Sequence, residues 1–295
     1  MRMADALNDE TWEKKMAIDV SVVIPCYNDG KYIEQAVSSV ELERKPDVEI
    51  IVVDDGSDDP ATLQILEKLR LQGVQVMRSS HEGPSGARNM GIAKARGRYI
   101  LPLDADDRIE SAYIDAAKKL LDADDTLGIV YCHADLFGAE KGPWRLPDYS
   151  LDQMLIDNVV FVTAMFRRED WVRVGGFRTD MEWGMEDYDF FLSILELDRN
   201  ICQLPEIYFH YRIRKKSRTE RYKRDFHQVE QTYERIYEHH RALYQKHMEL
   251  YVKTLRAEVI RHRYNHQRLI EKSGVLRVLF SCPVVKRLMM CLVRR

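Results

Sequence analysis

The chain has 295 residues, of which 45% are hydrophobic and 32% charged, and its formal net charge is −3. This length suffices for one large α/β domain with an appendage or for two smaller domains, and a mean hydropathy of −0.42 indicates a soluble protein. No stretch reaches the roughly 18 apolar residues of a transmembrane helix. Neither G-x-G-x-x-G nor G-x-x-x-x-G-K-[ST] occurs, which disfavours dehydrogenases and P-loop enzymes.

Charge is distributed unevenly along the chain. From Arg212 to the last residue there are 22 Lys and Arg against 8 Asp and Glu, so a basic C-terminal part follows an acidic body. This asymmetry suggests an anionic surface or partner, but no recognisable nucleic-acid-binding module is present and we expect no nucleic-acid partner. The five cysteines are scattered without a C-x-x-C pair, and no signal peptide is visible in the first twenty residues. We therefore expect a cytoplasmic protein with reduced thiols.

Short β-branched runs alternate with helical patterns over the first 132 residues. This alternation predicts a largely parallel sheet wrapped by helices, in which ligands bind outside the carboxyl ends of the strands. Strands are predicted at 20–25, 49–54, 73–77, 99–103 and 128–132, with helical segments at 32–40, 61–71 and 111–122. A loop that leads into a helix is predicted at 83–95.

The pattern is weaker beyond residue 145. A strand is predicted at 159–166, and short helices at 168–174 and 187–195. From about residue 222 to residue 272 the apolar residues recur near helical spacing, which predicts a helical C-terminal extension.

An acidic turn follows the predicted strand at 99–103. Asp104 and Asp106 stand at i and i+2 just past the strand end, where both carboxylates can address one hard cation. Mg²⁺ or Mn²⁺ prefers carboxylate oxygens together with substrate phosphates. The alternative is a solvated acidic turn, since Asp is common in loops.

Polar residues also end the neighbouring strand and the next loop. Asp54 and Asp55 could accept hydrogen bonds from a nucleobase or a ribose, while Ser57 or Asp59 could instead cap the following helix. Arg88 could bind a phosphate with two hydrogen bonds or form a surface salt bridge.

Four strings in this order resemble the family 2 glycosyltransferases of GT-A fold, which use nucleotide-activated sugars. They are Val22-Val23-Ile24-Pro25-Cys26-Tyr27-Asn28, Ile51-Val52-Val53-Asp54-Asp55-Gly56-Ser57, Gly86-Ala87-Arg88-Asn89 and Leu103-Asp104-Ala105-Asp106-Asp107. The resemblance continues through Gly175-Gly176-Phe177 and Trp183-Gly184-Met185-Glu186-Asp187 to about Arg214. It implies an α/β GT-A domain at 17–215, with a nucleotide-sugar half at 17–110 and an acceptor half at 111–215. A lead-in at 1–16 and a basic helical region at 216–295 would flank it.

The resemblance implies a role for each matching residue. Asp104 and Asp106 would hold the metal ion, and Asp104 would also contact the donor. Glu186 and Asp187 would be the acidic pair on the acceptor side, with Asp187 as the general base of an inverting single displacement. Their alternative is an acid pair at a helix N-terminus, which the helix dipole favours. The nucleotide pocket would be lined by Pro25, Tyr27 and Asn28, with Asp54 near the base and Arg88 at the diphosphate.

Three further residues complete the expected site. Trp183 would stack on a sugar or pack in the core. Family members often carry Tyr-Arg-x-His after the base, whereas this chain has Tyr211-Arg212-Ile213-Arg214. Arg214 could bind the diphosphate as a fixed cation, and His210 is the histidine left as a candidate third metal ligand.

The segment at 274–295 is apolar and cationic and contains no acid. Such a stretch could lie on an anionic membrane at the cytoplasmic face, or it could pack against the catalytic domain or a second subunit through the C-terminal helices. A membrane contact would suit a lipid-linked acceptor.

Together with these residues, the resemblance implies a metal-dependent transferase that moves a sugar to a hydroxyl of a glycan or lipid-linked acceptor. The resemblance alone implies a UDP-sugar as the donor. The alternative is a non-catalytic nucleotide-sugar-binding subunit of a glycan assembly complex.

Overall fold

The computed structural model describes residues 18–41, 45–214 and 225–272. The chain divides into two compact units, Met1–Leu243 and Tyr244–Arg295. The predicted lead-in at 1–16 and the apolar, cationic segment at 274–295 both lie outside the described residues.

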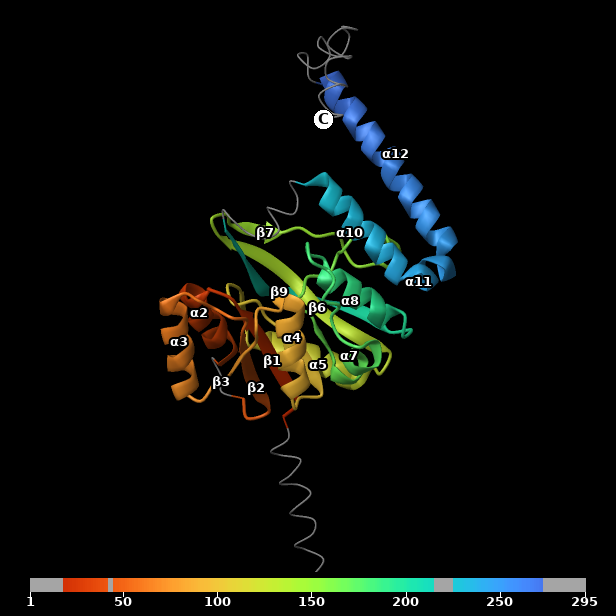
Figure 1. The fold of residues 1–295 in the computed structure, drawn as a ribbon. Helices are drawn as coiled ribbons and strands as arrows, with labels where there is room; N and C mark the ends of the chain where they lie inside the picture. Colours follow the sequence, from red (N-terminus) through yellow and green to blue (C-terminus); the bar gives the residue numbers. More distant parts are fainter. Residues whose placement is uncertain (1–17, 42–44, 215–224, 273–295) are drawn as a thin grey trace, which may run out of the picture. The chain divides into compact units, whose positions relative to one another are not determined.

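Parallel strands form the first half of the sheet, as the alternating pattern predicts. The first three in chain order are each followed by a helix that returns the chain to the same sheet edge, so the carboxyl ends of the strands gather on one side (Figure 1). In spatial order the strands are β3 (Gln75–Arg78), β2 (Val48–Asp54), β1 (Val20–Cys26) and β4 (Tyr99–Pro102). The helices are α2 (Gly30–Glu41), α3 (Pro60–Leu71) and α4 (Gly83–Lys94).

The second half makes the sheet mixed. Beyond β4 the sheet continues with an antiparallel strand, then a parallel pair, then an antiparallel edge. These strands are β8 (Met165–Arg167), β6 (Leu127–Gly138), β9 (Asn200–Ile213) and β5 (Arg108–Ile109), with β7 (Gly142–Trp144) paired to β6. The helices of this half are α5 (Ala112–Ala123), α6 (Leu151–Met154), α7 (Arg168–Val174), α8 (Glu186–Leu195) and α10 (Phe226–His239). The α/β class with flanking helices is confirmed.

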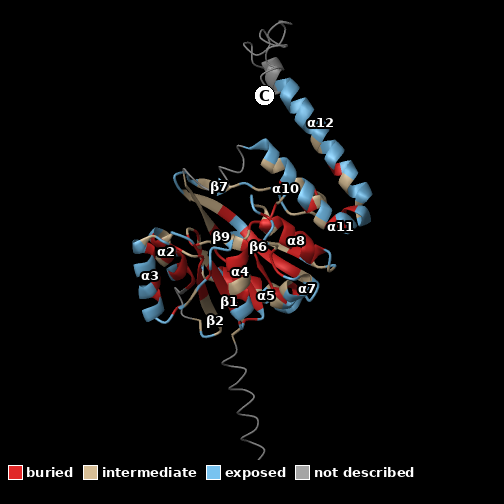
Figure 2. Ribbon diagram, viewed as in Figure 1, coloured by how far each residue is buried: buried red, intermediate tan, exposed pale blue. Residues whose placement is uncertain are grey.

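The hydrophobic core lies between the sheet and its helices. Val22, Val23 and Ile24 of β1 are 0% exposed, which explains their continuous apolar run. Helix α8 is buried at every position except Asp187, which is half-buried, and most of it is red in Figure 2. The first turn of α8 carries the acids Glu186, Asp187 and Asp189, and buried carboxylates of this kind require positively charged partners.

One predicted strand is shorter than expected, and one long strand was not predicted. The strand expected at 159–166 is confined to β8, and residues 159–164 form irregular structure. Strand β9 was not predicted, because Pro205 interrupts its sequence and its register with β6 shifts at two places near Cys132–Ala134. The helical prediction for the C-terminal part is confirmed where that part is described.

The second unit contains the end of α11 (Arg241–Lys246) and the long α12 (Met248–Lys272). Several apolar side chains of α12 are exposed, among them Val252, Leu255 and Val259. In the described part of the chain, no helix is both long and apolar enough to span a membrane.

Candidate active site

Asn28 ties the loop after β1 to the loop after β2. Its Oδ1 accepts from the backbone N–H groups of Asp58 (3.1 Å) and Asp59 (3.0 Å), and its Nδ2 donates to Asp58 Oδ1 at 2.7 Å. Its backbone has a φ of 54°, a left-handed conformation that Asn tolerates better than most residues. The side chain predicted to line the nucleotide pocket is therefore engaged in holding the two loops together.

Asp54 and Asp55 are buried at the end of β2 and are satisfied by their own neighbourhood. Asp54 accepts from Ser57 N at 2.9 Å and from Arg78 Nη1 at 2.5 Å. Asp55 accepts from Ser79 Oγ at 2.6 Å and from the backbone at the start of α4. Sequence reasoning missed Arg78, although the parallel register pairs it directly with Asp54. Asp59, one of the two residues considered as a helix cap, caps α3 through the N–H of Thr62.

Aromatic surface is exposed beside these loops. Tyr27 is 44% exposed and its ring lies 4.4 Å from that of His81, a residue that sequence reasoning did not select. Pro25 is paired with Val53 across β1 and β2, one position before Cys26 and Asp54. A flat base could stack on this exposed ring.

Arg88 joins the two halves of the site. Its guanidinium is 3% exposed and donates from Nη2 to Asp104 Oδ1 at 2.7 Å and from Nη1 to Glu186 Oε1 at 2.9 Å. The ring of Phe177 lies 5.7 Å from the guanidinium. Arg88 is therefore committed to two carboxylates, one from the acidic turn and one from the start of α8, rather than to solvent.

The acidic turn has the tight geometry that its spacing predicted. The N–H of Asp107 donates to the carbonyl of Asp104 at 3.0 Å, which closes the turn. Asp106 Oδ2 lies 2.7 Å from Arg214 Nε, and Arg214 Nη1 donates to Asp29 at 2.5 Å. Burial, with the charges of Asp104 and Asp29, raises the pKa of Asp106 to about 6 against the opposing effect of Arg214.

These two carboxylates fit a divalent cation. Arg88 occupies Oδ1 of Asp104 and Arg214 occupies Oδ2 of Asp106, so one oxygen of each faces no cationic side chain of the described chain. Two carboxylates without a full protein cage suit Mg²⁺ or Mn²⁺, which also takes phosphate and water oxygens. Among the residues that the structure describes, no three His, Cys, Asp or Glu side chains come together in a way that could hold a metal ion.

His210, the candidate third ligand, is not brought to this pair. Its Nδ1 lies 2.6 Å from Asp135 Oδ1 and its Nε2 lies 2.8 Å from Glu110 Oε1, so both ring nitrogens are engaged. Arg214, which stands where family members often have histidine, is the residue that contacts Asp106. At this position Arg214 therefore supplies a positive charge beside Asp106, where a histidine would have supplied a metal ligand.

Glu186 and Asp187 begin α8, where the helix dipole favours negative charge. Glu186 is 7% exposed and paired with Arg88, whereas Asp187 has no cationic side chain within ion-pair distance in the described residues. Burial, with the charge of Glu186, raises the pKa of Asp187 to about 7, although Arg88 lowers it. A carboxyl group that titrates near neutral pH is suited to act as a general base.

A charged cluster anchors α8 two residues beyond Asp187. Asp189 is 1% exposed and receives Arg178 at 2.9 Å, His239 at 2.7 Å and His240 at 3.2 Å. Burial raises the pKa of Asp189, but hydrogen bonds from His240, His239 and Arg178 outweigh burial and lower this pKa to about 2. The histidines come from the end of α10, so this helix belongs physically to the site region.

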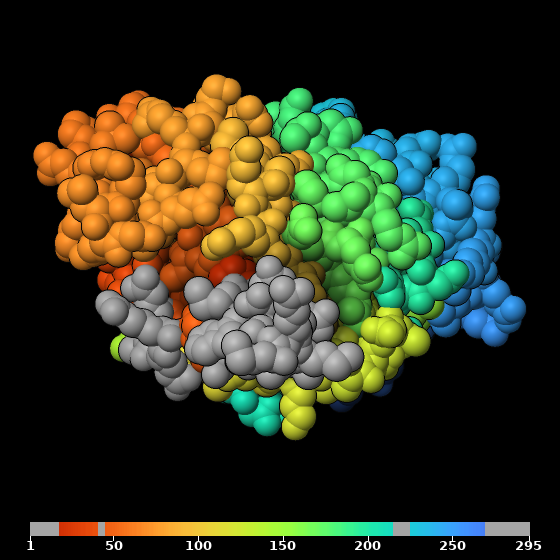
Figure 3. Space-filling model, turned by 90° about the horizontal axis from the view of Figure 1, so that it is seen from below, coloured from red at the N-terminus to blue at the C-terminus, as the bar shows by residue number. Residues whose placement is uncertain are grey.

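Asn89 fixes the turn that carries Phe177. Its Oδ1 accepts from Phe177 N at 2.9 Å and Trp171 Nε1 at 3.1 Å, and its Nδ2 donates to Phe177 O at 2.7 Å. Gly176, with a φ of 84°, leaves no room for a Cβ between Asn89 and Trp171. Figure 3 shows the N-terminal half in orange adjoining the later, green half across one face. Asn89 belongs to the motif Gly86-Ala87-Arg88-Asn89, for which the family resemblance implied a role only at Arg88.

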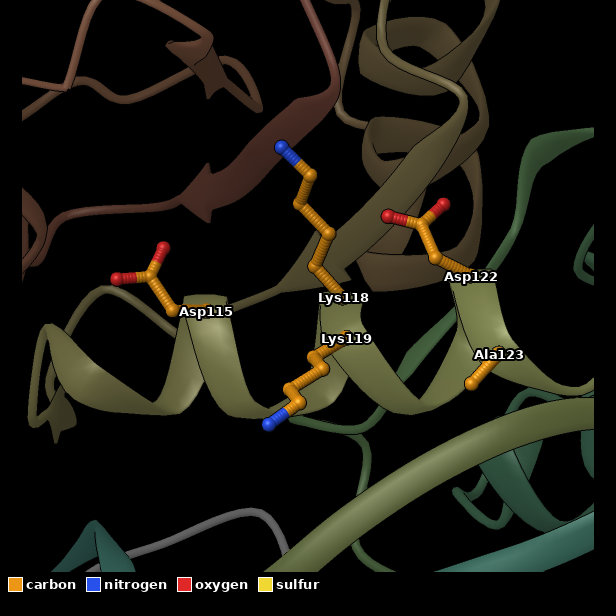
Figure 4. Close-up of a pocket in the computed structure, with 5 residues that line it drawn as sticks. All are labelled: Asp115, Lys118, Lys119, Asp122 and Ala123. Atoms are coloured by element: carbon orange, nitrogen blue, oxygen red, sulfur yellow. The ribbon is translucent and has the colours of Figure 1, made fainter.

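Trp183, just before α8, is 40% exposed, so it does not pack in the core. A shallow depression on α5 is lined by Asp115, Lys118, Lys119, Asp122 and Ala123 (Figure 4). Lys118 there is neutralised by Asp19 and by Asp47 at 2.8 Å, and none of the predicted site residues lines the depression.

The fold and the carboxylates around Arg88 define an α/β enzyme of the GT-A type. Residues 21–178, more than half of the chain, match the family model described as glycosyl transferase family 2. The chain therefore belongs to this family of glycosyltransferases. Members of the family are generally dependent on a divalent metal ion.

Curated relatives agree with this assignment. A chondroitin synthase of Pasteurella multocida is 29% identical over 186 residues, which are 61% of this chain and 19% of the relative. The glycosyltransferase GlyG of Streptococcus pneumoniae is 38% identical over 149 residues, or 48% of each chain. The chain thus spans between about a fifth and a half of the length of these relatives.

Solved structures share the fold. S. aureus TarS 1–349 in complex with UDP-GlcNAc matches with a TM-score of 0.58 and 23% identity over 68% of this chain and 60% of that one. The same protein in complex with UDP matches with a TM-score of 0.56.

Proposed function

We propose that the protein transfers a sugar from a nucleoside diphosphate donor to a hydroxyl group of a glycan or lipid-linked acceptor, by single displacement with inversion. The observation that carries this proposal is the arginine bridge, in which Arg88 connects Asp104 of the acidic turn to Glu186 beside Asp187. It brings a candidate metal-binding carboxylate and a candidate base into one charged network. Family membership supports the chemistry, and the UDP and UDP-GlcNAc complexes of TarS support a uridine diphosphate carrier.

Each residue near the bridge has a distinct task in this proposal. Tyr27 offers its exposed ring to the base, and Asp54, held by Arg78, faces the base or the ribose. Asp104 and Asp106 would hold Mn²⁺ or Mg²⁺, which when bound neutralises charge on the leaving diphosphate. Arg214 adds a fixed positive charge beside Asp106.

Asp187 would take the proton from the acceptor hydroxyl. Glu186 keeps a proton on Asp187 at low pH, because two neighbouring carboxylates resist sharing two negative charges. Arg88 opposes this effect and keeps the base available near neutral pH. Trp183, exposed just before α8, would contact a sugar ring at the same edge.

Two finer points belong to the proposal as well. A peripheral contact with the cytoplasmic face of a membrane through 274–295 would bring a lipid-linked acceptor to the site, and a homodimer through the C-terminal helices is the other use of that region. The exposed apolar side chains Val252, Leu255 and Val259 of α12 support a second surface of contact.

The direct test is turnover of a panel of nucleotide sugars, each assayed with Mn²⁺, with Mg²⁺ and with EDTA. We expect slow hydrolysis of one UDP-sugar in the absence of acceptor, lost with EDTA and in Asp106→Ala. If the natural protein binds a nucleotide sugar but hydrolyses no member of the panel, it is instead a nucleotide-sugar-binding subunit.

A further inference from the structure

Two arginines share one aromatic ring close to the acidic turn. The guanidinium carbons of Arg108 and Arg212 lie 4.3 Å and 4.1 Å from the ring centroid of Phe137, and Arg212 also lies 4.6 Å from that of Tyr32. We call these four residues the cationic stack. They come from β5, β9, β6 and α2, so the fold, not local sequence, assembles them.

The two guanidinium groups of the cationic stack form no ion pair with the residues that the structure describes. Across the described residues, neither Arg108 nor Arg212 has a carboxylate oxygen within 4.0 Å, whereas Arg88 and Arg214 have two acidic partners each. The Nε of Arg108 is buried without a hydrogen-bond partner. The guanidinium of Arg212 makes only neutral bonds, to the carbonyl of Asp106 and to Gln35, while its backbone N–H donates to Asp107 Oδ1 at 2.7 Å.

Two half-buried cations at one ring are unfavourable without an anion. Burial, with the charge of Arg108, lowers the pKa of Arg212, against the opposing effect of Asp106 and other neighbours. The aromatic contacts hold the guanidinium groups in place and recover part of the cost. An arrangement that is fixed in advance and lacks a partner is suited to receive a ligand with negative charge.

The position of the stack relates it to the acceptor. Arg108 follows Asp106 by two residues, and Arg212 donates to the Asp106 carbonyl, so the stack adjoins the acidic turn. In the proposed function, the diphosphate of the donor would meet positive charge at Arg214 and at the metal ion that Asp104 and Asp106 would hold. A further anion beside the turn is therefore more naturally part of the second substrate.

We propose that the cationic stack binds a negatively charged group, a carboxylate or a phosphate, of the acceptor glycan. This inference rests on the proposed function, since it names the chemical class of the acceptor for the same site. Planar guanidinium groups make paired hydrogen bonds to either anion, and they do so better than ammonium groups.

Arg108 is the informative position for substitution. Its guanidinium makes no hydrogen bond in the described structure, so Arg108→Gln removes a charge without breaking a bond. Arg212 is less suitable, because it is bonded to the acidic turn itself. Arg70→Gln is the matched control, because Arg70 is an exposed arginine of α3 that pairs with Glu67.

The experiment is calorimetric titration of the full chain with three probes. They are a glucuronate-containing oligosaccharide, its neutral carboxyl-reduced derivative and a glycerol phosphate oligomer. We expect at least one anionic probe to bind about tenfold or more tightly than the neutral one, the gain of a charge-assisted hydrogen-bond pair. The preferred anion then identifies the source, uronate or phosphate.

Variants decide whether the cationic stack is responsible. Arg108→Gln should abolish the preference for the anionic probe, Arg108→Lys should retain part of it, and Arg70→Gln should retain all of it. Equal binding of neutral and anionic probes by the natural protein would overturn the inference, as would a preference that survives in Arg108→Gln. Displacement of the anionic probe by UDP, with UDP binding equally weakened in Arg108→Gln, would assign the stack to the donor and also overturn it.

Donor hydrolysis without acceptor separates this inference from the proposed function. Hydrolysis by the natural protein together with equal probe binding would refute the acceptor class and leave the transferase intact. Charge-selective binding that depends on Arg108, with no hydrolysis of any nucleotide sugar, would leave the anion site and refute the transferase.

Discussion

The donor-side loops and the acceptor-side acid pair are stabilised in different ways. Around the donor, Asn28, Asp54 and Asp55 are satisfied mainly by backbone groups and side chains of the adjoining loops. On the acceptor side, Glu186 depends on Arg88, which lies 98 residues earlier in the chain. The proposed donor pocket is thus preformed at one sheet edge, whereas the state of the proposed acceptor-side carboxylates depends on one buried cation.

The largest effect should come from the candidate base. Asp187→Asn keeps the shape of the side chain but cannot accept a proton, so we expect the transfer rate to fall by about 10²–10⁴-fold. Affinity for UDP should change little, since Asp187 lies on the acceptor side. Asp115→Asn, an exposed substitution on α5, is the control. Equal loss of UDP affinity and rate would place Asp187 with the donor instead.

Removal of the bridging cation should be the next largest effect. Arg88→Met leaves two carboxylates, Asp104 and Glu186, without their buried partner, and we expect a loss of about 3–5 kcal/mol in the free energy of unfolding. Urea denaturation measures it. Arg70→Met on the surface should change stability far less, and comparable losses in both variants would contradict the bridge.

Asn89 tests the connection between the halves. Asn89→Ala leaves the N–H and carbonyl of Phe177 without partners, at a cost of about 1–3 kcal/mol. Because Phe177 stacks on Phe190 of α8 at 4.1 Å, the turnover rate should also fall while KM for the donor stays close to its original value. Asn200→Ala, on the exposed start of β9, should alter neither quantity.

The smallest expected effect is the pH dependence of the rate, which should differ from the pH dependence of donor affinity. The pKa of Asp187 is raised to about 7, so the base is lost to protonation as pH falls below that value. We expect the acceptor-dependent rate to fall about tenfold per pH unit below 7 and to level off above it. Donor affinity, measured separately, should not follow that curve. A rate that stays constant from pH 5 to pH 8 would exclude Asp187 as the base.

The same contrast explains how far the sequence could predict the site. Strand ends that share one edge of a parallel sheet bring Asp54 and Asp104 into one region, so alternation of strands and helices was sufficient there. The bridge from Arg88 to Glu186 depends on the antiparallel insertion of β8 and on the turn held by Asn89. No local pattern encodes such a contact.

Residue type alone was also a poor guide to the third metal ligand. His210 has the chemistry of a metal ligand, but its strand register places it between Asp135 and Glu110. Arg214, two residues on, reaches Asp106 instead. The cationic stack shows the same limitation, because Arg108 and Arg212 are far apart in sequence and meet only through the pairing of β5 with β9.

Stereochemistry tests the central claim most directly. A single displacement, with one carboxylate as base and a diphosphate as leaving group, inverts the anomeric carbon. NMR of the first sugar released when the natural protein hydrolyses its UDP-sugar reports that configuration before mutarotation. The arrangement of Asp104, Arg88, Glu186 and Asp187 predicts the inverted anomer, with release lost in Asp187→Asn. Release of the retained anomer would contradict it.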